Sequence, residues 1–437
     1  MLSRATTFAS ALAALAMLAG SSFAQDAQSQ VAHVIHAGRL LADASTGRVL
    51  TEQSILIGAD GRIIGIEAGY VTPAGAEIID QRARFVLPGL IDSHVHLTGE
   101  LGPNQLLEEV QLTSSDAALR GAQNARTTLN AGFTTVADLG APNDSIFALR
   151  RAIAEGRVPG PRIIASGSSV TPDGGHGDAN GFSPDVVDVL RSPSACSGAD
   201  ACRRAVRRQI QAGADVIKIT ATGGVLSNTA AGVEQQFSDE ELRAIVESAH
   251  AMGRRVTAHA HGAGGINAAL RAGVDSIEHG SYTDAESLRL MRRSGAYLVP
   301  TILAGVTVEE LADAGGVLTP NQAQKAREVG TRMRQSIQNA RRAGIRVAFG
   351  TDSGVSRHGI NAREFQFLVE GGYTPMQAIQ IATINAADHL QLGNVTGRIA
   401  AGYAADIIAV DGDPTQDVAV LMQVPFVMAR GAVFKNE

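Results

Sequence analysis

The chain has 437 residues, which exceeds one average domain and is enough to bury a large core. Its net charge is -6 and its basic and acidic residues are interspersed, so the sequence offers no basic surface for a nucleic acid. Tryptophan is absent and glycine is abundant at 48 residues, as in folds with many tight turns between strands and helices. These properties favour a soluble α/β protein that does not bind nucleic acids.

Residues 1–24 predict a secretory signal peptide. Arg4 precedes an apolar stretch from about Phe8 to Leu18, and Ser22-Phe23-Ala24 resembles a cleavage site with small residues. A membrane anchor is the alternative, but a span needs roughly 20 apolar residues and this stretch is shorter. We therefore expect cleavage after Ala24, a periplasmic or secreted product, and no membrane span in the mature chain.

Both ends of the remaining chain carry short apolar runs that are separated by glycine turns, a pattern typical of antiparallel strands. Asp60-Gly61 lies between two such runs and predicts a hairpin. The pattern returns near the C-terminal end, at Ile407–Val410 and Phe426–Met428. We expect residues 25–86 and 391–437 to build one small β-sandwich domain.

Residues 87–390 alternate short apolar strands with longer helical patterns, which predicts a parallel sheet. Ala-Gly pairs such as Ala212-Gly213 precede several of the strands and predict the ends of helices. Eight strands can be counted, the number that closes a TIM barrel. The predicted fold is therefore α/β: a (β/α)8 TIM barrel with the small β-sandwich built from both chain ends. The strands are Phe85–Leu97, Phe133–Val136, Arg162–Ala165, Val216–Ile219, Val256–His259, Ser276–His279, Tyr297–Pro300 and Val347–Gly350.

The first of these strands carries His94 and His96 at alternate positions. Residues two apart on a strand point to the same face, so both imidazoles can aim at one point. Neutral imidazole is a good ligand for zinc and similar metals. For this motif alone, two core histidines satisfied by hydrogen bonds are the alternative.

Polar residues at the ends of further strands favour a metal site. In a TIM barrel the working residues lie at the C-terminal ends of the strands. Five histidines, a lysine and an aspartate fall at such ends, and together they predict a metal-dependent active site. They are His94, His96, Lys218, His259, His261, His279 and Asp352.

These motifs resemble the amidohydrolase superfamily of metal-dependent hydrolases. Two glycine-rich stretches, Gly174–Gly177 and Thr222–Val225, are similar to the branch that contains Xaa-Pro dipeptidases, carboxypeptidase-like enzymes and ochratoxin-cleaving amidases. The superfamily likeness is carried by His94-Val95-His96, Ile217-Lys218-Ile219, Thr257–Gly262, Ile277–Gly280 and Gly350–Ser353.

The resemblance implies two divalent metal ions, with Zn2+ expected. Lys218 would be carboxylated to N6-carboxylysine and bridge both ions, because an ordinary ammonium adds positive charge and has no lone pair. A buried salt bridge between Lys218 and Asp352 is the alternative. In this interpretation one ion is held by His94, His96 and Asp352 and the other by His259 and His279.

Five residues receive roles in catalysis or substrate binding. Asp352 is expected to take the proton of the attacking water and deliver it to the leaving nitrogen. His261 would hydrogen-bond the substrate oxygen, although a purely supporting histidine is nearly as good an interpretation. Three residues in loops after predicted strands, His176, Tyr282 and His358, are expected to line the mouth and bind substrate.

We predict an exported amide or peptide hydrolase that releases a C-terminal residue from dipeptides or N-acyl amino acids, ochratoxin-like amides included. A cyclic amide or imidazolone hydrolase of the same superfamily is one alternative, because a fold does not determine its substrate. A non-catalytic metal-binding protein is the other. We further expect a homo-oligomer that acts on small molecules.

Cys196 and Cys202 lie in a short predicted loop. Cysteines this close tend to pair in an oxidising compartment, so we predict a disulfide between them. A second metal site is the alternative, but no histidine lies between the two cysteines.

Overall fold

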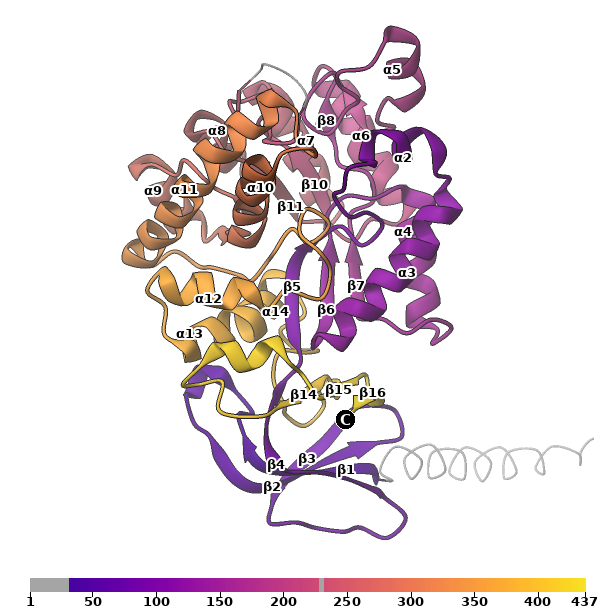
Figure 1. The fold of residues 1–437 in the computed structure, drawn as a ribbon, viewed down its shortest axis with the longest axis vertical. Coiled ribbons are helices and arrows are strands. Elements are labelled where there is room, and N and C mark those ends of the chain that lie inside the picture. Colours follow the sequence, from indigo (N-terminus) through magenta and orange to yellow (C-terminus); the bar gives the residue numbers. More distant parts are fainter. Residues whose placement is uncertain (1–30, 228–231) are drawn as a thin grey trace, which may run out of the picture.

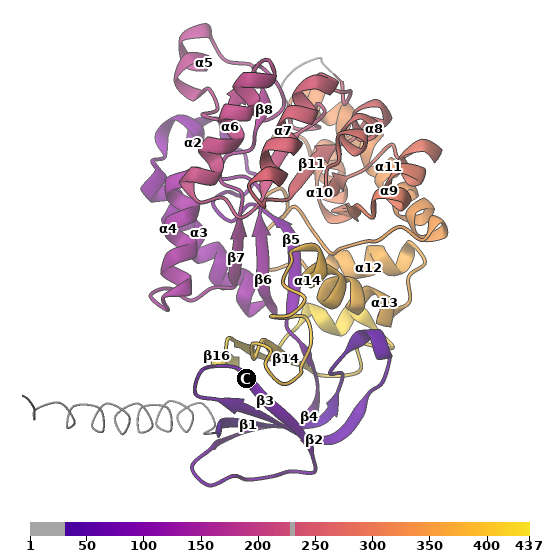
Figure 2. The same cartoon turned by 180° about the vertical axis from the view of Figure 1, so that it is seen from behind.

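The computed structural model describes residues 31–227 and 232–437. A larger part of helices around parallel strands lies above a smaller, sheet-rich part that also contains the C-terminus (Figure 1). The view from behind shows the same two parts, with α3 and α4 beside β6 and β7 (Figure 2). The predicted signal peptide, residues 1–24, falls outside the described residues.

The sheet-rich part is one seven-stranded sheet with the order β16-β15-β14-β4-β1-β2-β3. The long strand β4 pairs with β1 in parallel and, through Phe85–Pro88, with β14 in antiparallel, so it joins the two ends of the chain. The predicted hairpin at Asp60-Gly61 connects β2 and β3. The strands are β1 (Val31–Leu40), β2 (Leu50–Gly58), β3 (Ile63–Ala68), β4 (Glu77–Pro88), β14 (Ile407–Val410), β15 (Phe426–Ala429) and β16 (Ala432–Asn436).

This sheet differs from the expected sandwich, because its hydrogen bonds form one continuous sheet rather than two. It nevertheless encloses a single apolar core, in which Ile55 and Ile63 share a buried cluster with Phe426. Arg62 forms an antiparallel bridge with Ala404, so the edge at β3 returns to the C-terminal segment. The sheet therefore curls around its own core, while the domain limits at residues 25–86, 87–390 and 391–437 stay predictions.

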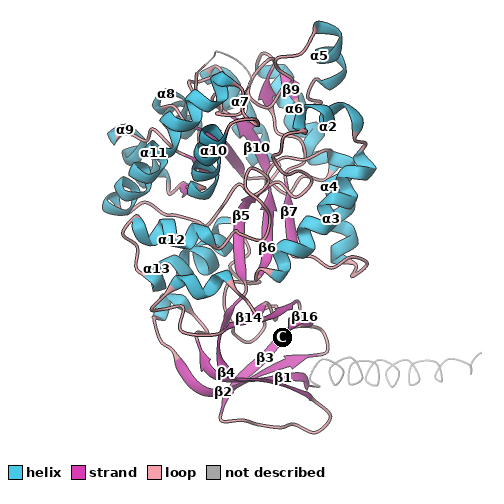
Figure 3. Cartoon of the chain, viewed as in Figure 1, coloured by secondary structure: helices cyan, strands magenta, loops and turns pink. Residues whose placement is uncertain are grey.

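The larger part contains two parallel sheets, of three and four strands. Neighbouring strands within each sheet run parallel, as predicted. In Figure 3 the helices, in cyan, surround these strands. The strands are β5 (Leu90–Val95), β6 (Phe133–Asp138) and β7 (Arg162–Ala165), then β10 (Ile217–Thr220), β11 (Val256–Ala260), β12 (Ser276–His279) and β13 (Tyr297–Val299).

The predicted eighth strand, Val347–Gly350, is not a strand in the structure. Val347 makes only a single parallel bridge, to Leu298. Just beyond it, Asp352 has a φ of 57°, in the left-handed region. The chain turns at Asp352, two residues beyond the end of the predicted strand.

Helices fill most connections between the strands, and the predicted helix-ending glycines are confirmed. Gly213, Gly273 and Gly344 each cap a helix with positive φ, a conformation that glycine adopts without strain. None of the described helices is long and apolar enough to cross a membrane. The helices are α2 (Gln105–Gln111), α3 (Ser114–Asn130), α4 (Asn143–Ala154), α5 (Pro184–Leu190), α6 (Ala199–Ala212), α7 (Asp239–Ala251), α8 (Ala263–Ala272), α9 (Ala285–Ser294), α10 (Ile302–Ala314), α11 (Pro320–Ala343), α12 (Arg363–Glu370), α13 (Pro375–Gln380) and α14 (Ala386–His389).

Cys196 and Cys202 form the predicted disulfide, with a Cα–Cα distance of 5.2 Å. Cys196 ends the short strand β9 (Ala195–Cys196), and Cys202 lies in the first turn of α6. β9 pairs with β8 (Thr171–Pro172), which leads into the loop that carries His176. The disulfide therefore fixes the base of this loop to a long helix.

Candidate active site

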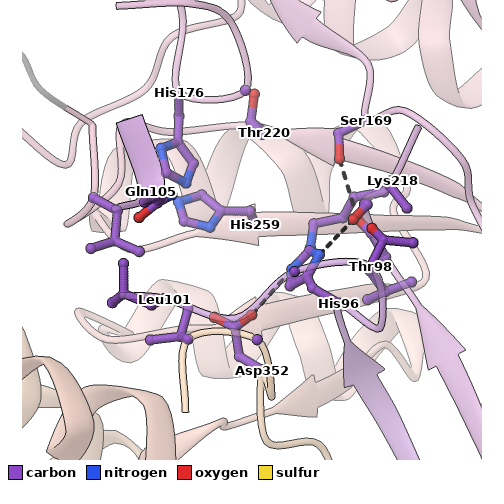
Figure 4. A pocket seen from close by; sticks show the side chains of 18 of the residues that line it. His96, Thr98, Leu101, Gln105, Ser169, His176, Lys218, Thr220, His259 and Asp352 are labelled. Atoms are coloured by element: carbon purple, nitrogen blue, oxygen red, sulfur yellow. Dashed lines mark hydrogen bonds and ion pairs between the residues drawn. The ribbon is translucent and has the colours of Figure 1, made fainter. Parts of the chain in front are cut away.

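A cavity of about 770 Å³ opens at the C-terminal ends of the parallel strands. Figure 4 shows His176 beside His259 in one part of it, and Lys218, His96 and Asp352 in another. The cavity is lined by every residue that the sequence predicts as a metal ligand or catalytic group: His94, His96, Lys218, His259, His261, His279 and Asp352.

His94 and His96 both direct a ring nitrogen towards Asp352, at the end of β5. The Nε2 atom of His96 lies 3.1 Å from Oδ1 of Asp352, and that of His94 lies 3.5 Å from the same oxygen. Lys218 on β10 places its Nζ atom 3.2 Å from Nε2 of His94. Four groups from three segments thus meet at one point.

The other nitrogens of these two imidazoles are held by acceptors. Nδ1 of His94 donates to the Glu278 carboxylate at 2.8 Å, and Nδ1 of His96 donates to the carbonyl of Gly140 at 2.8 Å. Because an acceptor holds Nδ1 of each ring, Nε2 is the nitrogen that faces the cavity, and it presents a lone pair when the ring is neutral. This orientation is the one that a metal ligand requires.

A second group of imidazoles lies at the ends of β11 and β12. The ring centroids of His259 and His279 are 4.7 Å apart, and those of His261 and His279 are 4.9 Å apart. Potential ligand atoms of all three lie within 4.8 Å of one another. His279 also forms such a group with His94 and Asp352, so it stands between the two sets.

The donor atoms of this cluster fit divalent metal ions. Among the described residues, none donates a hydrogen bond to Oδ1 of Asp352, although this buried oxygen faces the Nε2 atom of His96. Burial opposes ionisation of Asp352, but His94 and His96 outweigh it and hold the pKa of Asp352 well below its usual range. Burial opposes protonation of His96, but Asp352 raises the pKa of His96 in turn, and a metal cation between the carboxylate oxygen and the ring nitrogen would take the place of that proton.

Burial sets the charge of the remaining groups. It lowers the pKa of His259 and of His279, and the neighbouring imidazoles lower both further, so these rings are neutral and can donate lone pairs. Burial also lowers the pKa of Lys218. The chemistry of the set, neutral imidazole with carboxylate, is that of zinc and related ions.

Sequence reasoning missed Glu278, which is fully buried beneath the cluster. Its carboxylate accepts hydrogen bonds from His94 and Thr257, and from Ser276 at 2.9 Å. Burial opposes ionisation of this carboxyl, but the hydrogen bond from His94 keeps its pKa below the usual value. A charged residue inside a strand that is predicted to be buried is the signal that could have identified it.

Asp92 lies two residues before His94 and received no role from the sequence, and the structure shows what it does. Its carboxylate accepts hydrogen bonds from Oγ1 of Thr351 at 2.6 Å and from Nδ2 of Asn361 at 2.8 Å. Burial raises the pKa of Asp92 to about 6. These bonds tie β5, which carries His94, to the turn that presents Asp352.

Of the three predicted substrate-binding residues, one lines the cavity and two do not. His176 lines the cavity, with its ring centroid 4.2 Å from that of His259. His358 and Tyr282 do not line it, which corrects their predicted place at the mouth. Nε2 of His358 turns to the carbonyl of Gly99 at 3.1 Å, and Tyr282 packs against a buried apolar cluster.

The model of the Amidohydrolase family matches residues 85–433, a stretch that contains every predicted metal ligand. The chain belongs to this family. As an amidohydrolase, the protein is an enzyme that hydrolyses amide bonds.

Several relatives of this amidohydrolase have names or structures. Ochratoxinase of Aspergillus niger is 35% identical over 378 residues, covering 81% of this chain and 76% of that protein. The crystal structure of a Xaa-Pro dipeptidase with bound methionine is 38% identical, with a TM-score of 0.87 over 92% of this chain and 100% of the other. The crystal structure of Aspergillus niger ochratoxinase has a TM-score of 0.82 and 31% identity, over 93% and 97%. These relatives support the branch that the sequence motifs resemble.

Proposed function

We propose that this amidohydrolase is a binuclear metal-dependent enzyme that releases the C-terminal residue from dipeptides or N-acyl amino acids, ochratoxin-like amides included. The observation that carries the proposal is the buried convergence of imidazoles and Asp352 at the floor of a large cavity. Similarity to an ochratoxinase and to a Xaa-Pro dipeptidase supports this choice of substrates.

In this proposal Lys218 would be carboxylated to N6-carboxylysine and would help to hold two divalent ions such as Zn2+. When bound, such ions polarise a carbonyl and lower the pKa of a water molecule. The proximity of Lys218 to His94, 3.2 Å between Nζ and Nε2, supports its place in the ligand set. The remaining ligands are His94, His96 and Asp352 for one ion and His259 and His279 for the other.

In this proposal Asp352 transfers the proton of the attacking water, and His261 hydrogen-bonds the substrate carbonyl oxygen. Asp352 lacks a hydrogen-bond donor on Oδ1 among the described residues, so this oxygen is available to accept a proton from water and return it to the leaving nitrogen. Nδ1 of His261 lies 2.7 Å from the hydroxyl of Ser281, and burial lowers the pKa of His261 to about 3. A neutral ring that accepts from Ser281 donates its Nε2–H to the substrate carbonyl oxygen.

His176 receives the terminal carboxylate in this proposal. Its Nδ1 atom lies 2.6 Å from Oγ of Ser227, which leaves Nε2 for the substrate. Burial lowers the pKa of His176 to about 4, so the ring is neutral and acts as a hydrogen-bond donor rather than as a fixed charge.

We propose that the two parallel sheets close into a single (β/α)8 barrel. On one side, the backbone N–H of Ser93 donates to the backbone carbonyl of Phe349 at 2.7 Å. The backbone N–H of Asp352 donates to the backbone carbonyl of His94, also at 2.7 Å. On the other side, the backbone N–H of Val170 donates to the backbone carbonyl of Lys218 at 2.8 Å. These bonds support closure through segments too short to count as strands.

We also propose that the protein is periplasmic or secreted, after removal of residues 1–24. The disulfide between Cys196 and Cys202 supports this location, because such bonds persist in oxidising compartments. We expect a homo-oligomer, which light scattering of the purified protein would test.

The decisive experiment is a screen of dipeptides and N-acyl amino acids, each as the free acid and as the C-terminal amide. The proposal predicts turnover of free acids and at least tenfold lower kcat/KM for the amides, since these lack the carboxylate that His176 receives. Equal turnover of both forms contradicts recognition of the carboxylate. Turnover only of cyclic amides or imidazolones, or none with any divalent metal, overturns the proposed function.

A further inference from the structure

One side of the active-site cavity is apolar, and we call it the apolar wall. Ala304 and Val308 come from α10, and Val329 and Met333 come from α11. Val225 completes it from the loop after β10. Val225, Val308, Val329 and Met333 belong to one buried apolar cluster.

Another part of the cavity surface, contributed by α2, α3 and the residues next to them, carries charged side chains beside apolar ones such as Leu101 and Leu112. Glu108 and Arg120 line the cavity there and form an ion pair at 2.8 Å. Glu109, Thr113 and Ser114 lie beside this pair. Burial of an apolar substrate group against the apolar wall is therefore favourable. Placing the same group against Glu108 and Arg120 would remove water from these charged side chains, which costs free energy.

Close contacts between α10 and α11 and hydrogen bonds at the start of α10 position the apolar wall. A Cβ atom on Gly305 would lie 2.7 Å from the sulfur of Met333, so the helices approach closely at this glycine. Glu364 accepts hydrogen bonds from the backbone N–H groups of Ile302 and Leu303, at 2.9 and 2.7 Å, and fixes the start of α10. A rigid apolar surface can discriminate between side chains by size.

The apolar wall also lies next to His176. A Cβ atom on Gly224 would lie 2.2 Å from the His176 ring, and Val225 follows Gly224 directly in the chain. A residue whose carboxylate is bound by His176 thus has its side chain within reach of Val225 and of the helices behind it.

We infer that the apolar wall is the specificity subsite for the side chain of the residue that is released. The inference rests on the proposed function and deepens it: preferred substrates carry a large apolar C-terminal residue, such as phenylalanine, leucine or methionine. Glycine, alanine and charged residues at this position leave the wall unfilled or place a charge against it. One methylene group in such a pocket changes kcat/KM by roughly tenfold or more.

The test measures kcat/KM for N-acetyl-glycine, -alanine, -leucine and -phenylalanine. For the wild-type enzyme, kcat/KM is expected to rise from the glycine to the phenylalanine substrate. Val308→Phe fills the subsite. It should lower the ratio of kcat/KM for the phenylalanine substrate to kcat/KM for the alanine substrate about tenfold, mainly through KM. Val189→Phe is the matched control, because Val189 is 81% exposed on α5 and does not line the cavity.

Met333→Ala provides the opposite change and guards against misfolding of the first variant. It enlarges the subsite and should shift preference towards a tryptophan substrate relative to leucine. Wild-type turnover that is equal for glycine and phenylalanine substrates overturns the subsite but leaves the proposed function intact. Absence of turnover on this series and on the matching dipeptides, by contrast, refutes the proposed function itself, and the subsite with it.

Discussion

The core of the seven-stranded sheet and the floor of the active site are both buried, yet they bury different groups. Ile35 and Ile55 are fully buried and belong to the apolar cluster of the sheet core. His94 and Lys218 are almost as inaccessible, at 1% and 4% exposure, but they face each other and Asp352. Burial stabilises the first region through the hydrophobic effect and costs free energy in the second.

The difference indicates that stability and function are separated in space. Substitutions in the sheet core should change the free energy of unfolding and leave turnover intact, whereas substitutions at the floor should do the reverse. The floor is held in place by groups such as Glu278 and Asp92, which orient its members without lining the cavity.

The largest expected effect is on turnover, from Asp352→Asn. The amide cannot carry the proton from water to the leaving nitrogen, so kcat should fall by roughly 10²–10⁴-fold. The lowered pKa of Asp352 shows that the folded state favours its carboxylate, so the free energy of unfolding should also fall, but modestly compared with the loss of turnover. Steady-state kinetics and urea unfolding measure both quantities. A variant that keeps a tenth of the wild-type kcat would exclude Asp352 as the proton carrier.

Ile55→Ala should produce the opposite pattern. Ile55 is fully buried in the sheet core, and loss of its side chain should destabilise the protein by about 2–5 kcal/mol. At a temperature well below the transition, kcat/KM should remain within about twofold of wild type. Urea denaturation with parallel assays checks the prediction, and a large loss of activity in the fully folded variant would break the separation.

Glu278→Gln tests whether the residues beneath the floor act through the ligands. Its carboxylate accepts from Nδ1 of His94 at 2.8 Å, and loss of this partner should weaken metal affinity by about 10–100-fold. Titration of metal-free protein with Zn2+ measures the change. Thr135→Val is a control of similar burial, because Thr135 lies on β6 and makes no hydrogen bond to a ligand. Unchanged affinity in Glu278→Gln would show that the ligand geometry does not depend on this contact.

The smallest expected effect concerns pH and Glu364. Burial raises the pKa of Glu364 to about 8, above its usual 4.5. Because the folded-state pKa is raised, the contribution to stability is complete below pH 4.5 and is lost as pH rises through 8. Relative to Glu364→Gln, the unfolding free energy of the wild type should therefore fall by about 1 kcal/mol per pH unit between pH 6 and 7. Denaturation at several pH values measures it, and parallel pH profiles for the two proteins would contradict it.

Much of this architecture was predictable because it depends on local patterns. Short apolar runs predicted β5 to β7 and β10 to β13, and two neighbouring cysteines predicted the disulfide. The strand-end residues were found for the same reason: HxH spacing and isolated polar residues after apolar runs are visible in the sequence. The cavity brings all of these strand-end residues together.

The features that were missed depend on contacts between distant segments. The predicted eighth strand forms only one bridge, between Val347 and Leu298, and the left-handed turn at Asp352 beyond it cannot be read from the residue type. His358 follows a predicted strand, where a histidine can face the cavity, but its ring is hydrogen-bonded to the carbonyl of Gly99 instead. The apolar wall arises only when α10 packs on α11, so no single stretch of sequence predicts it.

The central claim is that Lys218 is carboxylated and bridges two metal ions. A crystal grown with Zn2+ and bicarbonate, measured at the zinc absorption edge, tests it directly. We predict two anomalous peaks roughly 3.5–4 Å apart, within reach of His94, Asp352 and His279, and branched density beyond Nζ of Lys218. A single peak next to an unmodified Lys218 amine would contradict the account.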